Sequence, residues 1–300
     1  MPRTKGEHVA AIGRAWRRVT GTIVRTPVVV AGGALVKRED LQVCGSFKTR
    51  GVANFLFAAP PSQQCRGVVC ASSGNTGRAL AMLNTTPTYV FVPSDADQSK
   101  IRRLLDCGAR VVPTAGDFAA VSAAARDFAA AHELLYCSSA TSWDFIYGNA
   151  TLGLELLQQC GRLDEIFVPI GGGGLAAGVG LALSLLPKAR RPALIGVELT
   201  VSCPVREHLA PSTGAPATGE SIADCMVGGL EAGAIILDLA AHALDDVVLV
   251  SDAQLLQAQE ELAHLGVAVG PGPAAAFAGY RSTPVRGRAV RSGIVVSGIG

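Results

Sequence analysis

Short runs rich in β-branched residues alternate with longer Ala- and Leu-rich stretches along most of this 300-residue chain. The short runs are predicted to be strands and the longer stretches helices, because each has the length and residue types of that element. The expected strands are 67–71, 88–92, 109–113, 165–170, 193–198, 246–250 and 293–297, and the expected helices are 75–84, 97–107, 117–132, 149–160, 174–186 and 252–265. Such alternation predicts an α/β fold with largely parallel sheets flanked by helices on both faces.

The composition disfavours several classes of protein. Hydrophobic residues make up 49% and charged residues 17% of the chain, which is typical of a packed protein rather than a disordered one. The net charge is +2 with no block of basic residues, so neither nucleic acid nor a membrane is expected as a partner. The eight cysteines form no CxxC pair and the five histidines no HxxxH pair, so no metal site is expected. Free thiols in a reducing cytoplasm are the simpler interpretation.

One uncharged segment, residues 166–187, is long enough to span a bilayer. Pro169 and the four consecutive glycines near it would break a membrane helix close to its start. A strand, a glycine turn and a buried helix are therefore expected instead. The stretch 210–221, rich in Pro, Gly, Ser and Thr, is expected to be a surface loop. The first thirty residues contain no uninterrupted apolar core of the signal-peptide type.

Three loops follow apolar strands: "ASSGNTG" (71–77), "PIGGGGL" (169–175) and "VVSGIG" (295–300). In α/β folds, ligands bind at the carboxyl ends of strands, in loops of this kind. We therefore expect the three loops to converge on one crevice.

The second loop has the features of a phosphate site. Gly171, Gly172, Gly173 and Gly174 expose a string of backbone N–H groups at the start of a helix. The alternative is a tight turn that needs positive φ angles, for which one or two glycines suffice. Neither GxGxxG nor a Walker lysine and serine is present, which disfavours a dinucleotide or a nucleoside triphosphate.

The first loop has more polar side chains than a helix start needs. Ser72, Ser73, Asn75 and Thr76 surround Gly74. One such residue is enough to cap a helix, and the others could bind a carboxylate through hydroxyl and N–H groups. The pattern alone does not separate capping from carboxylate binding.

Lys48 directly follows Phe47 in the apolar run "GSFKTRGVANFL" (45–56). Desolvation would lower the pKa of a lysine in this setting and make it a nucleophile or a base. The alternative is a lysine whose charged end reaches solvent. A lysine for a Schiff base, a glycine cradle for a phosphate and a polar loop for a carboxylate are together the parts of a pyridoxal-phosphate enzyme that acts on amino acids.

The chain also resembles a known family over nearly its whole length. The motifs, in order, are "RTPVVV" (25–30), "GSFKTRG" (45–51), "SSGNTG" (72–77), "YGNATLGLEL" (147–156), "PIGGGGLAAG" (169–178), "IGVE" (195–198) and "VVSGIG" (295–300). They are similar to those of the fold-type-II pyridoxal-phosphate enzymes, which include threonine and serine dehydratases, cysteine synthase and threonine synthase. The resemblance implies pyridoxal 5′-phosphate as the cofactor and two α/β domains, each with a largely parallel sheet.

The resemblance also implies roles for the site residues. Lys48 would form the Schiff base and then act as the base for the α-proton, and Arg50 would pair with an acid of the protein rather than with substrate. The cofactor would be held by Lys48, Asn75, Gly171, Gly172, Gly173, Gly174 and Ser297, and the substrate carboxylate by Ser72, Ser73, Gly74 and Thr76. The Ser297 hydroxyl would face the pyridine nitrogen without keeping it protonated, which favours β-elimination and replacement over transamination.

The expected activity is α,β-elimination on serine- or threonine-like amino acids. A β- or γ-replacement synthase is the alternative, and a catalytically silent homologue is a third possibility. The family further implies a homodimer, with a large cofactor-binding domain (1–45 and 149–300) around a small substrate-loop domain (46–148).

The chain departs from the family pattern at two positions. Gly270 stands where an acid is common, and no Asp lies near Glu198, which disfavours a racemase-type divalent metal site. The chain contains no regulatory domain after Gly300, so feedback control is not expected.

Overall fold

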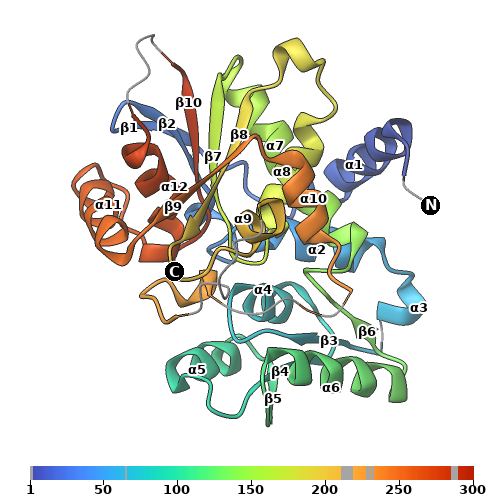
Figure 1. The fold of residues 1–300 in the computed structure, drawn as a ribbon. Coiled ribbons are helices and arrows are strands. Elements are labelled where there is room, and N and C mark those ends of the chain that lie inside the picture. Colours follow the sequence, from blue (N-terminus) through green and yellow to red (C-terminus); the bar gives the residue numbers. More distant parts are fainter. Residues whose placement is uncertain (1–2, 65, 211–218, 228–230, 232, 285–289) are drawn as a thin grey trace.

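The computed structural model describes residues 3–64, 66–210, 219–227, 231, 233–284 and 290–300, and it contains two sheets (Figure 1). The six-stranded sheet has the order β1-β2-β10-β7-β8-β9. Its strands are β1 (Val28–Ala31), β2 (Ala34–Arg38), β7 (Glu165–Pro169), β8 (Ala193–Leu199), β9 (Asp246–Val250) and β10 (Ser292–Val296). Only the β1–β2 pair within this sheet is antiparallel.

The second sheet has four parallel strands in the order β5-β4-β3-β6. Its strands are β3 (Val68–Ala71), β4 (Thr88–Pro93), β5 (Arg110–Thr114) and β6 (Leu135–Tyr136). Two largely parallel sheets, each flanked by helices, confirm the predicted fold class. Each strand expected from the sequence is present to within one residue at either end, whereas β1, β2 and β6 were not predicted.

Helices cover both sheets. They are α1 (Lys5–Val19), α2 (Lys48–Ala58), α3 (Pro61–Gln64), α4 (Asn75–Leu83), α5 (Gln98–Asp106), α6 (Phe118–Ala131), α7 (Trp143–Cys160), α8 (Gly174–Leu183), α9 (Pro204–Leu209), α10 (Ile236–Ala243), α11 (Asp252–His264) and α12 (Pro271–Ser282). Three short 3₁₀ helices are η1 (Glu39–Leu41), η2 (Lys188–Arg190) and η3 (Asp224–Met226). No helix in the described ranges is long and apolar enough to cross a lipid bilayer. Most of the expected loop 210–221 lies outside the described residues.

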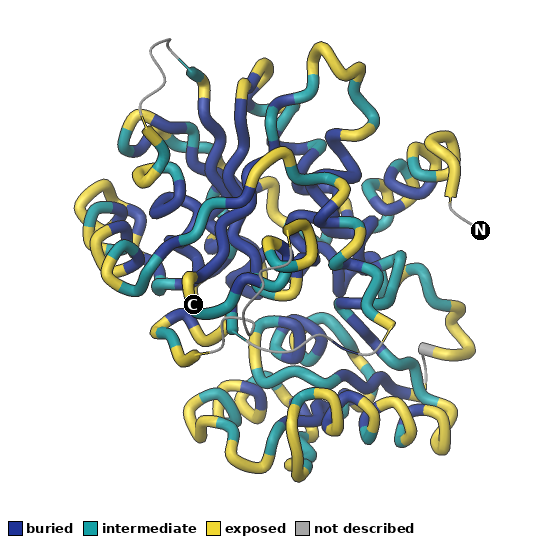
Figure 2. Tube along the Cα trace, viewed as in Figure 1, coloured by how far each residue is buried: buried dark blue, intermediate teal, exposed yellow. Residues whose placement is uncertain are grey.

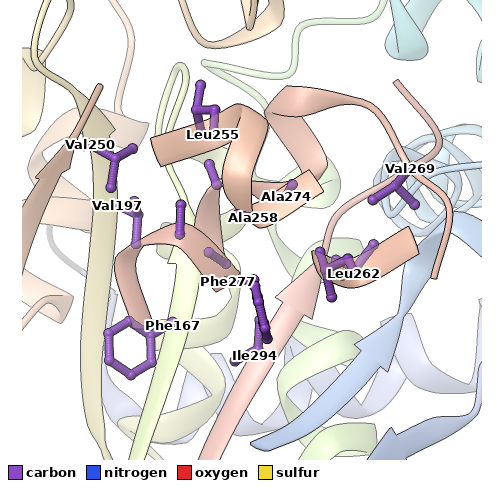
Figure 3. Close-up of a cluster of buried hydrophobic side chains, with 14 of the residues drawn as sticks. Phe167, Val197, Val250, Leu255, Ala258, Leu262, Val269, Ala274, Phe277 and Ile294 are labelled. Carbon is purple, nitrogen blue, oxygen red and sulfur yellow. The ribbon is translucent and has the colours of Figure 1, made fainter. Parts of the chain in front are cut away.

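The alternation of side chains along the strands divides the core into layers. On β7, Phe167 packs with α11 and α12, whereas Ile166 and Val168 pack with α7 and α8 on the opposite face. Figure 3 shows the first of these layers, in which Phe277 of α12 lies against the strands. In the second sheet, Val69 packs with α6 on the face opposite α2, α4 and α5. The inner strands β3, β7, β8 and β10 are therefore largely buried on both faces, and Figure 2 shows this buried centre (dark blue).

Helix α7 begins earlier than the sequence predicted. The Ser142 side chain accepts a hydrogen bond from the Phe145 N–H at 3.3 Å, and this cap starts the helix at Trp143 rather than at residue 149. Gly148 therefore lies inside the helix, where a Cβ would come within 2.3 Å of the Arg50 carbonyl oxygen. The missing side chain lets α7 pack directly against the backbone of α2, the helix that begins at Lys48.

Candidate active site

A cavity of about 340 Å³ lies among the loops that follow β3 and β7, beside the start of α2. An adjoining cavity of about 90 Å³ reaches the end of β10. Their walls include all the residues that the sequence singled out: Lys48, Ser72, Ser73, Gly74, Asn75, Thr76, Gly171, Gly172, Gly173, Gly174 and Ser297. The structure thus brings the three predicted loops together, while the role of each residue stays a prediction.

Lys48 is the first residue of α2 and is partly buried. Its Nζ atom lies 4.8 Å from the centroid of the Phe47 ring and 5.8 Å from that of Phe145. Burial lowers the pKa of Lys48 to about 8, and the neighbouring Cys225 and Cys137 partly oppose this shift. A much larger fraction of this amine than of an ordinary lysine is therefore neutral, and nucleophilic, near neutral pH.

The start of α2 is attached to the end of β10. The Phe47 N–H donates to the Ser297 carbonyl oxygen at 3.0 Å, and Ser46 and Gly298 form an antiparallel bridge. The Ile299 N–H donates to the Gly45 carbonyl oxygen at 2.9 Å. These bonds fix Lys48 and the predicted partner of the pyridine nitrogen, Ser297, on adjoining backbone segments.

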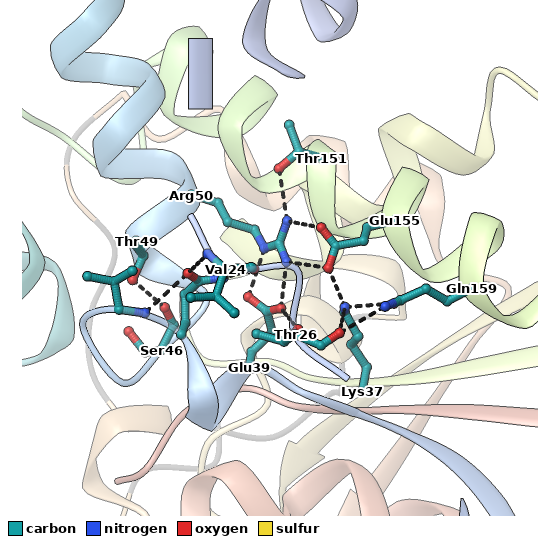
Figure 4. A network of polar contacts seen from close by, with 12 residues as sticks. Val24, Thr26, Lys37, Glu39, Ser46, Thr49, Arg50, Thr151, Glu155 and Gln159 are labelled. Carbon is teal, nitrogen blue, oxygen red and sulfur yellow. Dashed lines mark hydrogen bonds and ion pairs between the residues drawn. The ribbon is translucent and has the colours of Figure 1, made fainter. Parts of the chain in front are cut away.

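Arg50 lies two residues after Lys48 and is fully buried. Its guanidinium donates to both carboxylate oxygens of Glu39, at 2.8 and 2.7 Å, and to both of Glu155, at 3.1 and 3.0 Å (Figure 4). The expectation that Arg50 pairs with acids of the protein is confirmed. The guanidinium joins α2 to η1 and α7 through paired hydrogen bonds, which have a specific geometry.

Lys37 completes this buried cluster from β2. Its Nζ donates to the Thr26 carbonyl oxygen at 2.7 Å and to Gln159 Oε1 at 2.8 Å, and it forms an ion pair with Glu155. Burial lowers the pKa of Lys37, although the bonded Glu155 opposes the shift. The four charged side chains of the cluster, those of Lys37, Glu39, Arg50 and Glu155, carry two positive and two negative charges. Sequence reasoning missed Lys37, Glu39 and Glu155, and β2, which carries Lys37, was not predicted either.

Two positions of the glycine turn after β7, Gly171 and Gly173, do not accept a side chain without strain. A Cβ at Gly171 would lie 2.8 Å from the Cys225 carbonyl oxygen, and Gly173 has a φ of 89°. Asn149 Nδ2 donates to the Gly174 carbonyl oxygen at 3.1 Å and holds the turn from α7. The first N–H groups of α8 have no partner within the helix and face an anion favourably. The turn therefore fits the phosphate of a cofactor.

The polar loop after β3 does not cap α4 with a side chain. Gly74 occupies the N-cap position, and no side-chain cap bond forms there. The Ser72 hydroxyl accepts from the Gly74 N–H at 3.3 Å, which shapes the turn before the helix. The capping interpretation of the surplus polar residues therefore fails. Ser73 and Thr76 lie on the cavity wall instead.

The cavity wall also includes residues that no motif predicted. Tyr136, Ser138 and Glu231 form a hydrogen-bonded group there, and Cys137 and Cys225 lie close to it along the chain. Burial raises the pKa of both thiols. Their raised pKa values distinguish them from the activated thiolates of cysteine enzymes.

Comparison with known proteins defines the class to which this fold and site belong. The family model described as pyridoxal-phosphate dependent enzyme matches residues 19–298. The chain belongs to this family, whose members use pyridoxal 5′-phosphate, and this confirms the predicted cofactor and the resemblance on which it rested.

The similar proteins include ammonia-lyases and serine racemases. L-threonine ammonia-lyase of Geobacter sulfurreducens is 32% identical over 269 residues, which are 85% of this chain and 64% of that protein. L-threo-3-hydroxyaspartate ammonia-lyase of Saccharomyces cerevisiae is 30% identical over 303 residues, 95% of this chain and 90% of the relative. Among solved structures, maize serine racemase has a TM-score of 0.87 at 26% identity, with 97% of this chain and 92% of the racemase covered. The chain thus spans less than two thirds of the length of the Geobacter sulfurreducens L-threonine ammonia-lyase.

Proposed function

We propose that this chain is a pyridoxal-phosphate-dependent lyase that acts on serine- or threonine-like amino acids. Loss of water across the α- and β-carbons, followed by hydrolysis, gives a 2-oxo acid and ammonia. The single observation that carries the proposal is the cavity in which Lys48, with its lowered pKa, meets the polar loop and the glycine turn. The ammonia-lyases among the relatives support it.

The residues of the site divide the work of elimination. Bound pyridoxal phosphate supplies an electron sink for the α-carbon. Lys48 Nζ takes the α-proton, since its pKa is near the working pH of an enzyme base. Ser72, Ser73, Gly74 and Thr76 hold the substrate carboxylate. Asn75, the glycine turn and Ser297 would hold the cofactor at its 3′-oxygen, its phosphate and its ring nitrogen, respectively.

The domain arrangement is part of the proposal. Residues 46–148 would form the small domain that carries the polar loop, with 1–45 and 149–300 as the large domain; the boundary lies inside α7. Two ion pairs connect the proposed domains at the cavity, Lys100 with Asp224 and Arg126 with Glu231. Substrate binding at the loop would draw the small domain inward and exclude water.

The proposed assembly is a homodimer, and the proposed location is the cytoplasm. The unpaired thiols of the described cysteines are compatible with a reducing compartment.

Reconstitution with pyridoxal phosphate tests the cofactor site directly. The wild type is expected to develop an absorbance band at the violet edge of the visible spectrum, and Lys48→Ala is expected to lose it. Lys188→Ala, which changes an exposed lysine of η2, should keep the band. A wild type without the band would refute the proposal.

A second experiment separates elimination from its alternatives. The holoenzyme is mixed with serine, threonine and O-activated serines, with and without added thiols or amines. Release of 2-oxo acid without an added nucleophile indicates the lyase, whereas a new amino acid formed only with a nucleophile indicates the replacement synthase. The chirality of the remaining serine reports racemisation, and no change in any arm indicates a silent homologue.

A further inference from the structure

The end of the cavity formed by α6 and β6 has a buried carboxylate with an ordered set of partners. The Glu231 side chain is only 5% exposed. Its Oε1 atom accepts from Arg126 Nη2 at 2.7 Å and from the Tyr136 hydroxyl at 2.9 Å, and its Oε2 atom accepts from the Ser138 hydroxyl at 2.6 Å. Tyr136, Ser138 and Glu231 line the cavity, whereas the Arg126 side chain is 45% exposed and is not part of its wall.

The two hydroxyls of this group have no proton left for a ligand. The Ser138 hydroxyl gives its proton to Glu231 and accepts from the backbone N–H groups of Ala140, at 3.1 Å, and Thr141, at 3.0 Å. The Tyr136 hydroxyl has one proton, and its shortest contact is with Glu231; the carbonyl oxygen of Ser122 lies farther away, at 3.5 Å. The Ser138 hydroxyl is therefore fully occupied, and the Tyr136 hydroxyl can only accept a further hydrogen bond.

Glu231 itself has a vacant acceptor position. A carboxylate has about four lone-pair sites, and three donors occupy Glu231 within the described part of the chain. Apolar residues complete this end of the cavity, among them Phe118 and Val121. The cation Lys100 also lines the cavity, but it forms an ion pair with Asp224. Lys100 lies on the side of the polar loop, because it also lines a smaller adjoining pocket that does not include Glu231.

We propose that Glu231 selects the substrate by its side chain. This end of the cavity accepts amino acids whose side chain donates a hydrogen bond, such as a hydroxyl or an amide, and rejects those that end in a carboxylate. The inference rests on the proposed function, because it assumes that the α-carboxylate is held at the polar loop and that the side chain points to α6 and β6. Like charges brought together with little water between them repel strongly, whereas a hydroxyl or amide completes the hydrogen bonds of Glu231.

Asparagine and aspartate are suitable probes because they have the same shape and differ in charge, and neither has a leaving group on the β-carbon. Binding to the holoenzyme is followed by the change in cofactor absorbance at pH 8. Wild type is expected to bind L-asparagine at least roughly tenfold more tightly than L-aspartate, the factor expected for a partly shielded like-charge contact. Equal affinities, or tighter binding of aspartate, would overturn the inference.

Two variants should change the ratio of asparagine affinity to aspartate affinity in opposite directions. Glu231→Gln removes the charge and should reduce the asparagine preference to near one. Arg126→Gln removes the external cation that offsets the carboxylate, so the preference should increase. The Arg126 side chain is 45% exposed, so Arg126→Gln should still fold. This variant therefore tests the role of Glu231 even where Glu231→Gln does not fold. Glu260→Gln, on the exposed face of α11, should leave the ratio unchanged. Identical ratios in wild type, Glu231→Gln and Arg126→Gln would refute the role of Glu231.

Turnover distinguishes the two proposals. L-Threonine and L-threo-3-hydroxyaspartate both carry a β-hydroxyl, and only the second has a side-chain carboxylate. Wild type should release 2-oxo acid mainly from threonine, and Glu231→Gln should narrow the difference. If no amino acid yields 2-oxo acid but asparagine is still preferred over aspartate, the proposed reaction fails and the selectivity of Glu231 stands.

Discussion

The Arg50→Met substitution tests whether the buried charge cluster holds the start of α2 in place. It removes five hydrogen bonds from the guanidinium, four of them to the carboxylates of Glu39 and Glu155. Two carboxylates then share the single positive charge of Lys37 in a site without solvent access. Removing one partner of a buried ion pair costs about 4 kcal/mol in the free energy of unfolding. A 300-residue protein has an unfolding entropy of roughly 0.6 kcal/mol/K, so the melting temperature should fall by about 6 °C.

Thermal unfolding followed by circular dichroism measures this change, with Arg281→Met as the matched control. Arg281 forms an ion pair with Glu261 on the surface, and its side chain is 45% exposed. Removal of a surface pair costs below about 1 kcal/mol, so the control should melt within about 2 °C of the wild type. Equal small shifts in both variants would show that the Arg50 cluster is solvated or can rearrange, and would refute the argument.

The other predictions concern the cofactor and the assembly. The rate at which the cofactor-free protein captures pyridoxal phosphate should increase with pH, with a midpoint near pH 8, because the Lys48 amine is protonated at lower pH. A midpoint above pH 10 would contradict the lowered pKa of Lys48. Thr76→Ala should weaken amino-acid binding yet keep the cofactor spectrum, whereas Asn75→Ala should change the spectrum itself. Equal loss of cofactor binding in both would show that the roles in this loop are wrongly assigned. Light scattering at micromolar concentration should give the mass of a dimer, and a monomer mass would refute the proposed assembly.

The sequence predicted the interior strands well because their burial on both faces leaves a recognisable apolar run. β7 reads as such a run, whereas β2 contains a lysine and an arginine, and nothing nearby in the sequence shows that Lys37 has buried partners. The start of α7 was misplaced because Gly148 resembles a helix break, although here it permits contact between two helices.

The site residues that the sequence identified lie in short loop motifs, where local pattern carries the information. The residues that it missed meet only through the tertiary fold. Glu231 is separated from Tyr136 by 95 positions and from Ser138 by 93, and Lys37 from Glu155 by 118. No periodicity or spacing links residues at such separations, so their shared chemistry emerges only when the sheets and helices are in place.

The buried cluster also bears on the reactivity of Lys48. Arg50 is only two residues away, and an unpaired guanidinium there would lower the pKa of the lysine further. In this structure the lowered pKa of Lys48 comes instead from burial, which Cys225 and Cys137 partly oppose. This is expected, because the two carboxylates of the cluster balance the charges of Lys37 and Arg50. Arg50→Met leaves that balance one negative charge in excess, which favours the protonated amine. The midpoint for cofactor capture should therefore move above 8 in this variant, even in molecules that remain folded, and an unchanged midpoint would show that the cluster positions α2 without tuning its lysine.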